Sequence, residues 1–451
     1  MNSKQLVLTA MQNKETPRAP WVPFVGCHAA KLLGVTAKEF FNSADLIVKG
    51  VQLATERYRA DGIPTLFDLQ VEAEALGCDL VWADRNPPMV ASHPLAEGKT
   101  LADLKIPTKN DGRFPIVLEA TKRIYETVGK DKAIYGLITG PFTLALHLLG
   151  TDIFYNMIDA REETHELLKF CEAVCIETAR MYIEAGVDII AVVDPMTSQI
   201  SPDAFVEFVS PYCTAIYKSV RAQGKAVTLF VCGDATANIE VMCKSLPDGL
   251  SIDENIPLDY VRDTCQKYNI SFGGNIKLTV TMLFGSVADN VNDTMNCLAI
   301  GGKKGFILAP GCDMPYDVPF ENAEACAAAA MGDVAELMES TSPLEGVEAN
   351  LPDFSDKSKV YIDVITLDSL SCAPCQYMME AVNTAAKGYD NLVIAEYKVK
   401  EKSSVAAMIK LGVSNIPTIC IDGKIKFVSI IPEADSIRAA YDEALAAKGL
   451  K

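Results

Sequence analysis

Short apolar runs alternate along the first part of the chain with longer segments whose apolar residues recur at helical spacing. Eight runs have the length and composition of buried strands: 19–26, 62–68, 133–140, 187–194, 226–233, 249–255, 270–276 and 305–311. Amphipathic helices are predicted between them, for example over residues 203–224 and 258–269. This alternation is typical of repeated βα units with a parallel sheet, and eight units predict a (β/α)8 TIM barrel, an α/β fold.

The pattern changes after residue 340. Residues 341–357 combine Pro, Gly and charged residues without periodicity, which predicts a linker. Beyond the linker, strand and helix patterns follow in the order β-α-β-α-β-β-α. We therefore expect a barrel domain over residues 1–340 and a smaller α/β domain over residues 358–451.

Composition narrows the classes of function. The chain has 451 residues, 49% of them hydrophobic and 22% charged, a balance typical of a globular protein. The formal net charge of -18 disfavours binding to nucleic acid or to an anionic membrane surface, because both need clustered Lys and Arg residues. No apolar run reaches the roughly 18 residues of a membrane span, and the first residues lack the apolar segment of a signal peptide. We expect a cytoplasmic protein.

The 14 cysteines predict free thiols, metal ligands or redox pairs rather than a disulfide framework, since the chain is long and expected to be intracellular. The clearest local motif is Cys372-Ala-Pro-Cys375, which follows a predicted strand and begins a predicted helix. A thiol at a helix N-terminus meets the positive end of the helix dipole, which lowers its pKa. We expect Cys372 to be the attacking thiol and Cys375 the resolving thiol of a redox pair.

A second feature of this domain is Ile416-Pro417-Thr418, where a cis proline at Pro417 would shape the substrate face beside the dithiol. The order of elements, the CAPC helix and this segment resemble the small thioredoxin-like redox domains over residues 358–451. Full-length thioredoxins have tryptophan where this chain has Ser371. The resemblance implies dithiol chemistry, with a thioredoxin reductase as a partner. The alternative, half of a structural zinc site, lacks a second Cys/His pair nearby.

In a (β/α)8 barrel, the residues that carry chemistry lie at the carboxyl ends of the strands. The predicted ends supply thiols, acids, an imidazole and an amide: Cys27, His28, Asp68, Glu72, Glu74, Thr139, Asp194, Cys232, Asp234, Asp253, Glu254, Asn275, Cys312 and Asp313. Cys232 and Cys312 follow different strands, and two thiolates at one barrel mouth are soft ligands of the kind that zinc prefers.

Three polar residues of this set have two interpretations each. Glu72 either faces the site or is a solvated acid at a helix start. Asp194 follows a fully apolar strand and either serves the site or caps the next helix. Asn275 either binds substrate or satisfies the end of its strand.

Six segments, EAEALG, LITGPFTLA, VDIIAVVDPMTS, VCGDA, GGNI and GFILAPGCDMP, resemble in this order the uroporphyrinogen decarboxylase superfamily over about residues 1–340. Within the superfamily they are similar to the corrinoid-dependent methyltransferases typified by methylcobamide:coenzyme M methyltransferase. The decarboxylases carry an N-terminal arginine-rich motif for the carboxylates of their substrate, and residues 19–30 contain no arginine. The resemblance therefore implies methyl transfer rather than porphyrinogen decarboxylation.

The resemblance also implies a zinc ligand set. The methyltransferases hold zinc with a His-x-Cys motif on the fifth strand and with the cysteine of a Gly-Cys segment on the eighth. Cys232 and Cys312 match these two cysteines, whereas Phe230 stands in the place of the histidine. Because side chains alternate along a strand, the ring of Phe230 is expected to face the barrel mouth on the same side as Cys232. Phenylalanine cannot bind a metal.

Three interpretations of the two barrel cysteines follow. Zinc is held by Cys232 and Cys312 with a replacement ligand, for which His28, Cys27 and Asp194 are available. Alternatively, the two cysteines act as thiols, which the thioredoxin-like domain reduces. In the third interpretation, both cysteines are inert and the chemistry lies elsewhere.

The function we favour is a corrinoid-dependent methyltransferase of anaerobic one-carbon metabolism. It would move a methyl group between a methyl-corrinoid (a cobalamin-type cofactor), carried on a separate corrinoid protein, and a thiol or other small-molecule acceptor. The fused domain would supply dithiol reduction. Two alternatives are a demethylase that passes the methyl group of an O-, N- or metalloid-methyl donor to a corrinoid protein, and a non-catalytic corrinoid or redox accessory protein.

Overall fold

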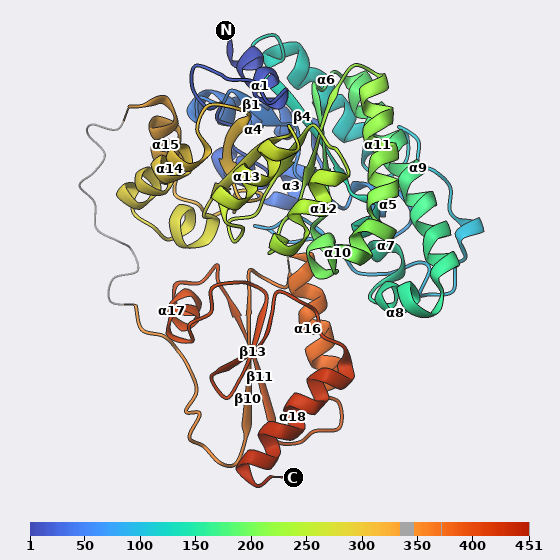
Figure 1. Cartoon of the computed structure of the whole chain (residues 1–451), viewed down its shortest axis with the longest axis vertical. Coiled ribbons are helices and arrows are strands. Elements are labelled where there is room, and N and C mark those ends of the chain that lie inside the picture. The colour runs from blue at the N-terminus through green and yellow to red at the C-terminus, as the bar shows by residue number, and fades with distance from the viewer. Residues whose placement is uncertain (334–346, 371, 451) are drawn as a thin grey trace. The chain divides into compact units, whose positions relative to one another are not determined.

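The computed structural model describes residues 1–333, 347–370 and 372–450. They belong to two compact units, residues 1–340 and 341–451, which are described separately (Figure 1). Residues 341–346 of the expected linker and Ser371 lie outside the described residues. Residues 347–357, the described part of the linker, contain no helix or strand.

The first unit is built on a parallel sheet of seven strands. In hydrogen-bonded order these are β1 (Gly62–Pro64), β4 (Ala133–Thr139), β5 (Ile189–Val193), β6 (Ala226–Phe230), β7 (Gly249–Ser251), β8 (Ser271–Ile276) and β9 (Phe306–Pro310). The two edge strands, β1 and β9, belong to the second and eighth of the runs expected from the sequence. The first predicted run, residues 19–26, is not among these seven strands, so it has to supply the segment that closes the sheet.

The segment around Trp21 closes this sheet into a barrel. The Val22 amide donates to the Leu308 carbonyl at 2.9 Å, and the Leu308 amide donates to the Pro20 carbonyl at 2.9 Å. On the other side, the Asp61 amide donates to the Trp21 carbonyl at 2.8 Å. Pro20 and Pro23 have no amide hydrogen, so this first strand makes a parallel bridge rather than a long ladder. The predicted (β/α)8 barrel is confirmed.

Helices surround the sheet (Figure 1). They are α1 (Ser3–Met11), α2 (His28–Leu33), α3 (Ala37–Phe41), α4 (Ala44–Arg57), α5 (Val71–Ala75), α6 (Phe114–Val128), α7 (Pro141–Leu149), α8 (Asp152–Asp159), α9 (Arg161–Ala185), α10 (Pro202–Phe208), α11 (Ser210–Ala222), α12 (Ile239–Lys244), α13 (Leu258–Lys267), α14 (Val287–Gly301) and α15 (Phe320–Met331). A short hairpin of β2 (Leu80–Val81) and β3 (Met89–Val90) follows α5. The single helix predicted over residues 203–224 is wrong: the chain forms α10 and α11 there, because Pro211 cannot continue a helix from the turn before it.

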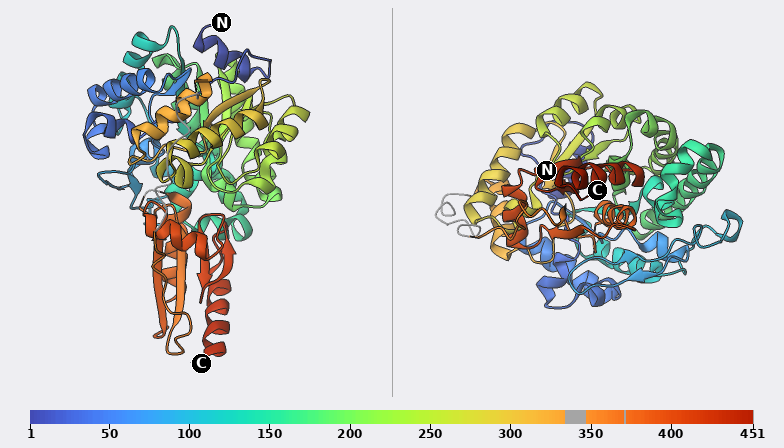
Figure 2. Two further views of the ribbon diagram at one scale, coloured as in Figure 1. Left: turned by 90° about the vertical axis from the view of Figure 1, so that its left-hand side faces the viewer. Right: turned by 90° about the horizontal axis from the view of Figure 1, so that it is seen from below.

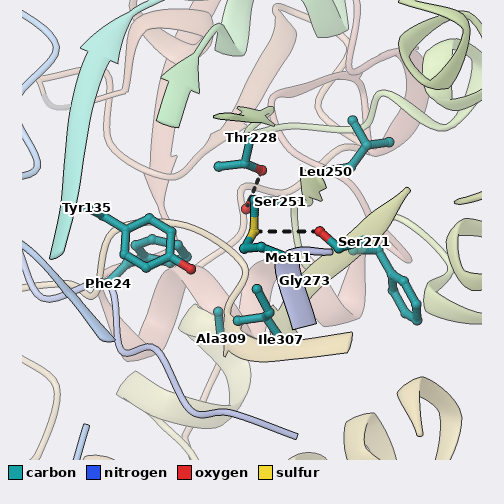
Figure 3. Close-up of a pocket in the computed structure, with 11 residues that line it drawn as sticks. Met11, Phe24, Tyr135, Thr228, Leu250, Ser251, Ser271, Gly273, Ile307 and Ala309 are labelled. Carbon is teal, nitrogen blue, oxygen red and sulfur yellow. Dashed lines mark hydrogen bonds between the residues drawn. The ribbon is translucent and has the colours of Figure 1, made fainter. Parts of the chain in front are cut away.

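The amino-terminal ends of the strands are closed by α1. Met11 of this helix lies inside the barrel beside Ser251 and Ser271, and its sulfur accepts a hydrogen bond from the Ser271 hydroxyl at 3.6 Å (Figure 3). The cavity left around these side chains measures only about 10 Å³. As far as the described residues show, the interior at this end is thus a packed core, which leaves the carboxyl ends of the strands for chemistry.

The second unit has a four-stranded sheet in the order β11 (Leu392–Lys398), β10 (Val360–Thr366), β12 (Thr418–Ile421) and β13 (Lys424–Val428). The strands β10 and β11 are parallel, and β12 is antiparallel to both of its neighbours. The helices α16 (Ala373–Ala385) and α18 (Ala434–Lys448) pack with β10 and β12 into one apolar core, and α18 runs alongside the sheet in Figure 2. With α17 (Lys402–Lys410), the element order is the one predicted, and the thioredoxin-like α/β fold is confirmed.

Among the helices of the described residues, none has both the length and the apolar character that a crossing of the bilayer requires.

The closure of the barrel generates a prediction for its stability. Asp61 is buried and accepts from the Trp21 amide at 2.9 Å and from both Nη atoms of Arg18 at 2.6 and 2.8 Å. We expect Asp61→Ala to lower the free energy of unfolding by about 2–4 kcal/mol, because the buried Trp21 amide and the partly buried Arg18 guanidinium then lose their hydrogen-bond acceptor. This free energy is measured by urea denaturation with tryptophan fluorescence as the signal, since both tryptophans, Trp21 and Trp82, lie in the first unit.

The matched control is Asp45→Ala. Asp45 also bonds to an arginine, Arg123, but its side chain is 70% exposed, so we expect no change beyond experimental error. Equal effects of the two substitutions would contradict the role of Asp61 in closing the barrel.

Candidate active site at the carboxyl ends of the barrel strands

Two cysteines meet at the carboxyl ends of β6 and β9. Cys232 lies two residues beyond β6 and Cys312 two residues beyond β9, and both are partly exposed. The structure joins them as a disulfide with their Cα atoms 6.1 Å apart, although 80 positions separate them in the sequence. We refer to Cys232 and Cys312 as the barrel cysteine pair. A closed barrel allows this contact, because the loops after non-neighbouring strands converge over one mouth.

An aromatic cluster lies directly under the barrel cysteine pair. The Phe230 ring is fully buried, 4.9 Å from the ring centre of Phe24 and 5.7 Å from that of Phe67. Both cysteines pack against the core that contains these three rings. Phe230 therefore belongs to the apolar core of the barrel, and its ring supports the sulfur atoms from below.

The loop after β7 contacts the loops of both cysteines. The Gly233 amide, next to Cys232, donates to Asp253 Oδ2 at 2.7 Å. Gly311, next to Cys312, lies so close to the loop that a Cβ atom there would be 2.5 Å from the Glu254 nitrogen. Asp253 and Glu254 thus lie on a loop between that of Cys232 and that of Cys312.

Burial changes the proton affinity of these two acids. It raises the pKa of Asp253, and it raises the pKa of Glu254 to about 8, with the negative charge of Asp253 adding to the effect. One Glu254 oxygen accepts from the Leu278 amide. The sequence places both acids at the end of a strand, but only the structure shows that they lie beside the barrel cysteine pair.

Asn275 holds the same loop in place. Its amide nitrogen donates to the Asp253 carbonyl at 3.0 Å and to the Ile256 carbonyl at 2.8 Å. Of its two predicted interpretations, the structure shows a side chain that satisfies the backbone of the neighbouring strand end. Any role of Asn275 in the site is therefore exerted through the position of the Asp253 loop.

Asp194 is buried and caps α7. Its carboxylate accepts from the Thr143 amide at 2.8 Å, from the Thr143 hydroxyl at 2.6 Å and from the Phe142 amide at 3.1 Å. The interpretation of Asp194 as a cap for the helix that follows it is wrong, because the helix that it caps, α7, comes before β5 in the chain. Burial raises the pKa of Asp194 to about 6. Gly140 permits this approach, because a Cβ atom there would lie 2.3 Å from the Asp194 Cβ.

Glu72 lies on α5 and is 1% exposed, so the interpretation as a solvated acid is wrong. Its carboxylate accepts from the Thr139 amide at 3.1 Å and from the Thr139 hydroxyl at 2.9 Å, at the end of β4. Burial raises the pKa of Glu72 to about 7. It is a protonatable group held at the end of a barrel strand.

Arg113 is a buried residue of this region that sequence reasoning missed, since it lies far along the chain at the start of α6. It bonds to Asp68 and, through Nε at 2.6 Å, to Glu74, and its guanidinium lies 4.8 Å from the Trp82 ring centre. The structure thereby accounts for two of the acids predicted at the end of the second strand. They neutralise a buried cation.

His28 is engaged in other contacts. Its Nδ1 is 3.1 Å from the Tyr316 carbonyl and its Nε2 is 2.6 Å from the Tyr58 hydroxyl, and burial lowers its pKa to about 4. Cys27 is buried, with its sulfur 3.8 Å from the Met314 carbonyl. Within the part of the chain that the structure describes, no three His, Cys, Asp or Glu side chains gather as a metal site would require.

The residues at the barrel mouth therefore do not fit zinc. Phe230 offers no donor atom, and the ring nitrogens of His28 and the oxygens of Asp194 are already hydrogen-bonded. Among the described residues, the structure brings Cys232 and Cys312 together without a third ligand.

The second unit holds the other two sulfurs of interest. Cys372 is the N-cap of α16 and partly exposed, whereas Cys375 is buried and accepts from the Leu367 amide at 3.3 Å. Burial and the neighbouring Cys372 thiol raise the pKa of Cys375. The Ile416–Pro417 peptide bond is cis, as expected. We refer to Cys372 and Cys375 as the CAPC dithiol.

Comparison with known proteins gives two family matches. A model described as "Uroporphyrinogen decarboxylase (URO-D)" matches residues 2–332, and one described as "Thioredoxin domain" matches residues 360–442.

Two curated relatives are methylcobamide:CoM methyltransferases. MtbA of Methanosarcina acetivorans is 29% identical over 57% of this chain and 75% of its own length. MtaA of Methanosarcina barkeri is 28% identical over 72% of this chain and 96% of its own length. A solved "methyltransferase from Methanosarcina mazei" superimposes with a TM-score of 0.69 at 26% identity, over 74% of this chain and all of that one.

The raised pKa of Glu72 generates a prediction about pH. The native state binds the proton of Glu72 more tightly than the unfolded state, so the stability of the barrel falls as pH rises from about 4.5 to about 7. A single group contributes at most about 1.4 kcal/mol per pH unit to this slope. We expect Glu72→Gln to flatten the dependence, measured as urea midpoints by tryptophan fluorescence. Glu163→Gln, an exposed acid on α9, is the control and should leave the slope unchanged.

The missing third ligand generates a prediction about metal content. We expect the reduced wild-type chain and Cys312→Ala to retain far less than one equivalent of zinc after desalting. Phe230→His should retain about one equivalent, because it restores a His-x-Cys arrangement with an open position. Metal analysis of the desalted protein checks this result.

Two further variants serve as controls for the metal experiment. Phe24→His places an imidazole elsewhere in the same aromatic cluster and should bind no zinc. Phe230→His combined with Cys312→Ser should lose it again. One equivalent of zinc in the reduced wild type would show that the native residues do fit the metal.

Proposed function

Because the chain belongs to the uroporphyrinogen decarboxylase family and carries a C-terminal thioredoxin domain, we propose that its barrel is a corrinoid-dependent methyltransferase. It moves a methyl group between a methyl-corrinoid on a separate corrinoid protein and a thiol or other small-molecule acceptor. Relatives that are methylcobamide:CoM methyltransferases support the reaction class. The barrel cysteine pair, at the end of the barrel where such enzymes do their chemistry, is the observation that carries the proposal.

The reduced barrel cysteine pair activates the acceptor. A methyl-corrinoid supplies an electrophilic methyl carbon, and the bond that breaks leaves its electron pair on the corrinoid. One cysteine thiolate takes the proton of the acceptor thiol, whose sulfur then forms the new bond to the methyl carbon. Every atom is accounted for: the methyl group goes to the acceptor sulfur and the proton to the cysteine.

The surroundings of the two cysteines suit this chemistry. The rings of Phe24, Phe67 and Phe230 exclude water from below, which strengthens the electrostatic effect of a thiolate above them. Glu254 exchanges a proton close to neutral pH, since burial raises its pKa to about 8, and it adjoins the loop of Cys312. It is the group we assign to return the proton to solvent.

Substitution of the barrel cysteine pair tests the proposal. We expect the serine variant of the cysteine that acts as the base, Cys232→Ser or Cys312→Ser, and the double variant to lower the rate of methyl transfer by about 10²–10⁴-fold, the range of a lost general base. The chain is reduced with a phosphine, desalted and mixed anaerobically with methylcobalamin and a thiol, and the corrinoid absorbance is followed. Cys326→Ala, a buried cysteine on α15, is the control and should keep the wild-type rate.

Three outcomes decide between the candidate functions. Methylation of the thiol, with a strong loss in at least one single serine variant and in the double variant, supports the proposal. Methylation of the corrinoid by an O-, N- or metalloid-methyl donor, with no thiol methylation, would instead establish a demethylase. No turnover in either direction would leave a binding or redox accessory protein.

A further inference from the structure

The disulfide of the barrel cysteine pair defines a second state of the proposed site. A disulfide has no thiolate and cannot accept a proton from an acceptor thiol, so the oxidised barrel is inactive in methyl transfer. This inference rests on the proposed function. It raises the question of which reductant returns the pair to the dithiol.

Solvent exposure of the cysteines points to the answer. All 14 cysteines of the chain lie in the described residues, and 11 of them are buried. The three that are partly exposed are Cys232, Cys312 and Cys372. These are the two sulfurs of a disulfide and the attacking thiol of a dithiol, the set that a disulfide exchange requires at the surface.

The CAPC dithiol has the asymmetry of a reductant. Cys372 is at the N-terminus of the 13-residue helix α16, where the helix dipole favours a negative charge. Cys375 is buried behind it, and its raised pKa keeps it a thiol until a mixed disulfide has formed next to it.

We propose that the CAPC dithiol reduces the disulfide of the barrel cysteine pair in its own chain. The Cys372 thiolate attacks one sulfur of the barrel pair, the Cys232–Cys312 bond breaks, and the released thiolate takes up a proton. The Cys375 sulfur then loses its proton and attacks Cys372, which frees the second barrel thiol and closes the Cys372–Cys375 disulfide. Two electrons and two protons pass from the CAPC dithiol to the barrel pair, and an external dithiol reductase is needed only for the next cycle.

Tethering makes this exchange efficient. The two pairs are parts of one polypeptide, so their encounter is intramolecular and its rate is independent of protein concentration. Effective concentrations between tethered domains reach the millimolar range when the linker lets the two sites meet.

A trapped intermediate tests the proposal in the full-length chain. In Cys375→Ser the exchange stops after the first attack, so we expect a disulfide between Cys372 and Cys232 or Cys312 within the same chain. Thiols are blocked with N-ethylmaleimide, and the joined peptides are identified by mass spectrometry after proteolysis. Cys375→Ser/Cys420→Ser, which also lacks a buried cysteine of β12, should trap the same species, and Cys375→Ser/Cys372→Ser none.

A rate measurement complements the trap. The fully oxidised wild type receives one equivalent of dithiothreitol, and thiol blocking at intervals shows when Cys232 and Cys312 become free. We expect these thiols to appear about 10²-fold faster than in Cys372→Ser. Equal rates in the two proteins, or cross-links only between different chains, would overturn the proposal.

The two proposals fail separately. Methyl transfer by phosphine-reduced Cys372→Ser at the wild-type rate shows that the barrel works without the CAPC dithiol once it is reduced, and the exchange is judged by thiol release alone. If the mixed disulfide of Cys372 with Cys232 or Cys312 forms but no methyl transfer occurs, the result supports the disulfide exchange and contradicts the methyltransferase function.

Discussion

The closure of the barrel is the constraint on which the rest of the structure depends. A sheet of seven parallel strands becomes a ring only because the proline-flanked segment at Trp21 bonds to β9 on one side and to Asp61 on the other. Closure brings the carboxyl ends of β6 and β9 to one mouth, and Cys232 and Cys312 meet there across three strand positions. In an open sheet the same two cysteines would lie far apart.

Buried carboxylates give the mouth its shape. Asp194 caps α7, Glu72 bonds to the end of β4, and Asp253 bonds to the amide beside Cys232. Each accepts from backbone amides that the ends of strands and the starts of helices leave unpaired, which is why acids recur at these positions. Burial raises the pKa of all three acids, that of Glu72 to about 7 and that of Asp194 to about 6.

Phe230 stands where the resemblance to the methyltransferases implies a metal-ligating histidine, and a phenyl ring there changes the chemistry that the site can perform. The Phe230 ring packs against the two cysteines but has no atom that could bind a metal beside them. The two sulfurs are then able to form a disulfide with each other. A pair of thiols that interconverts with a disulfide needs a source of electrons, and we propose that the thioredoxin domain on the same chain is that source. In this proposal, Phe230 in the barrel and the presence of the second domain have one physical explanation.

The sequence by itself determined the two folds and their order, because apolar periodicity sets the elements and eight βα units close in one way. It also identified the four cysteines that carry the proposals, since each follows a strand or begins a helix. Only the tertiary structure decided that Cys232 and Cys312 are paired, that Asp253 and Glu254 lie between their loops, and that His28 and Asn275 are bonded elsewhere. These facts depend on which side chains meet across distant strands, and periodicity along a chain carries no information about such contacts.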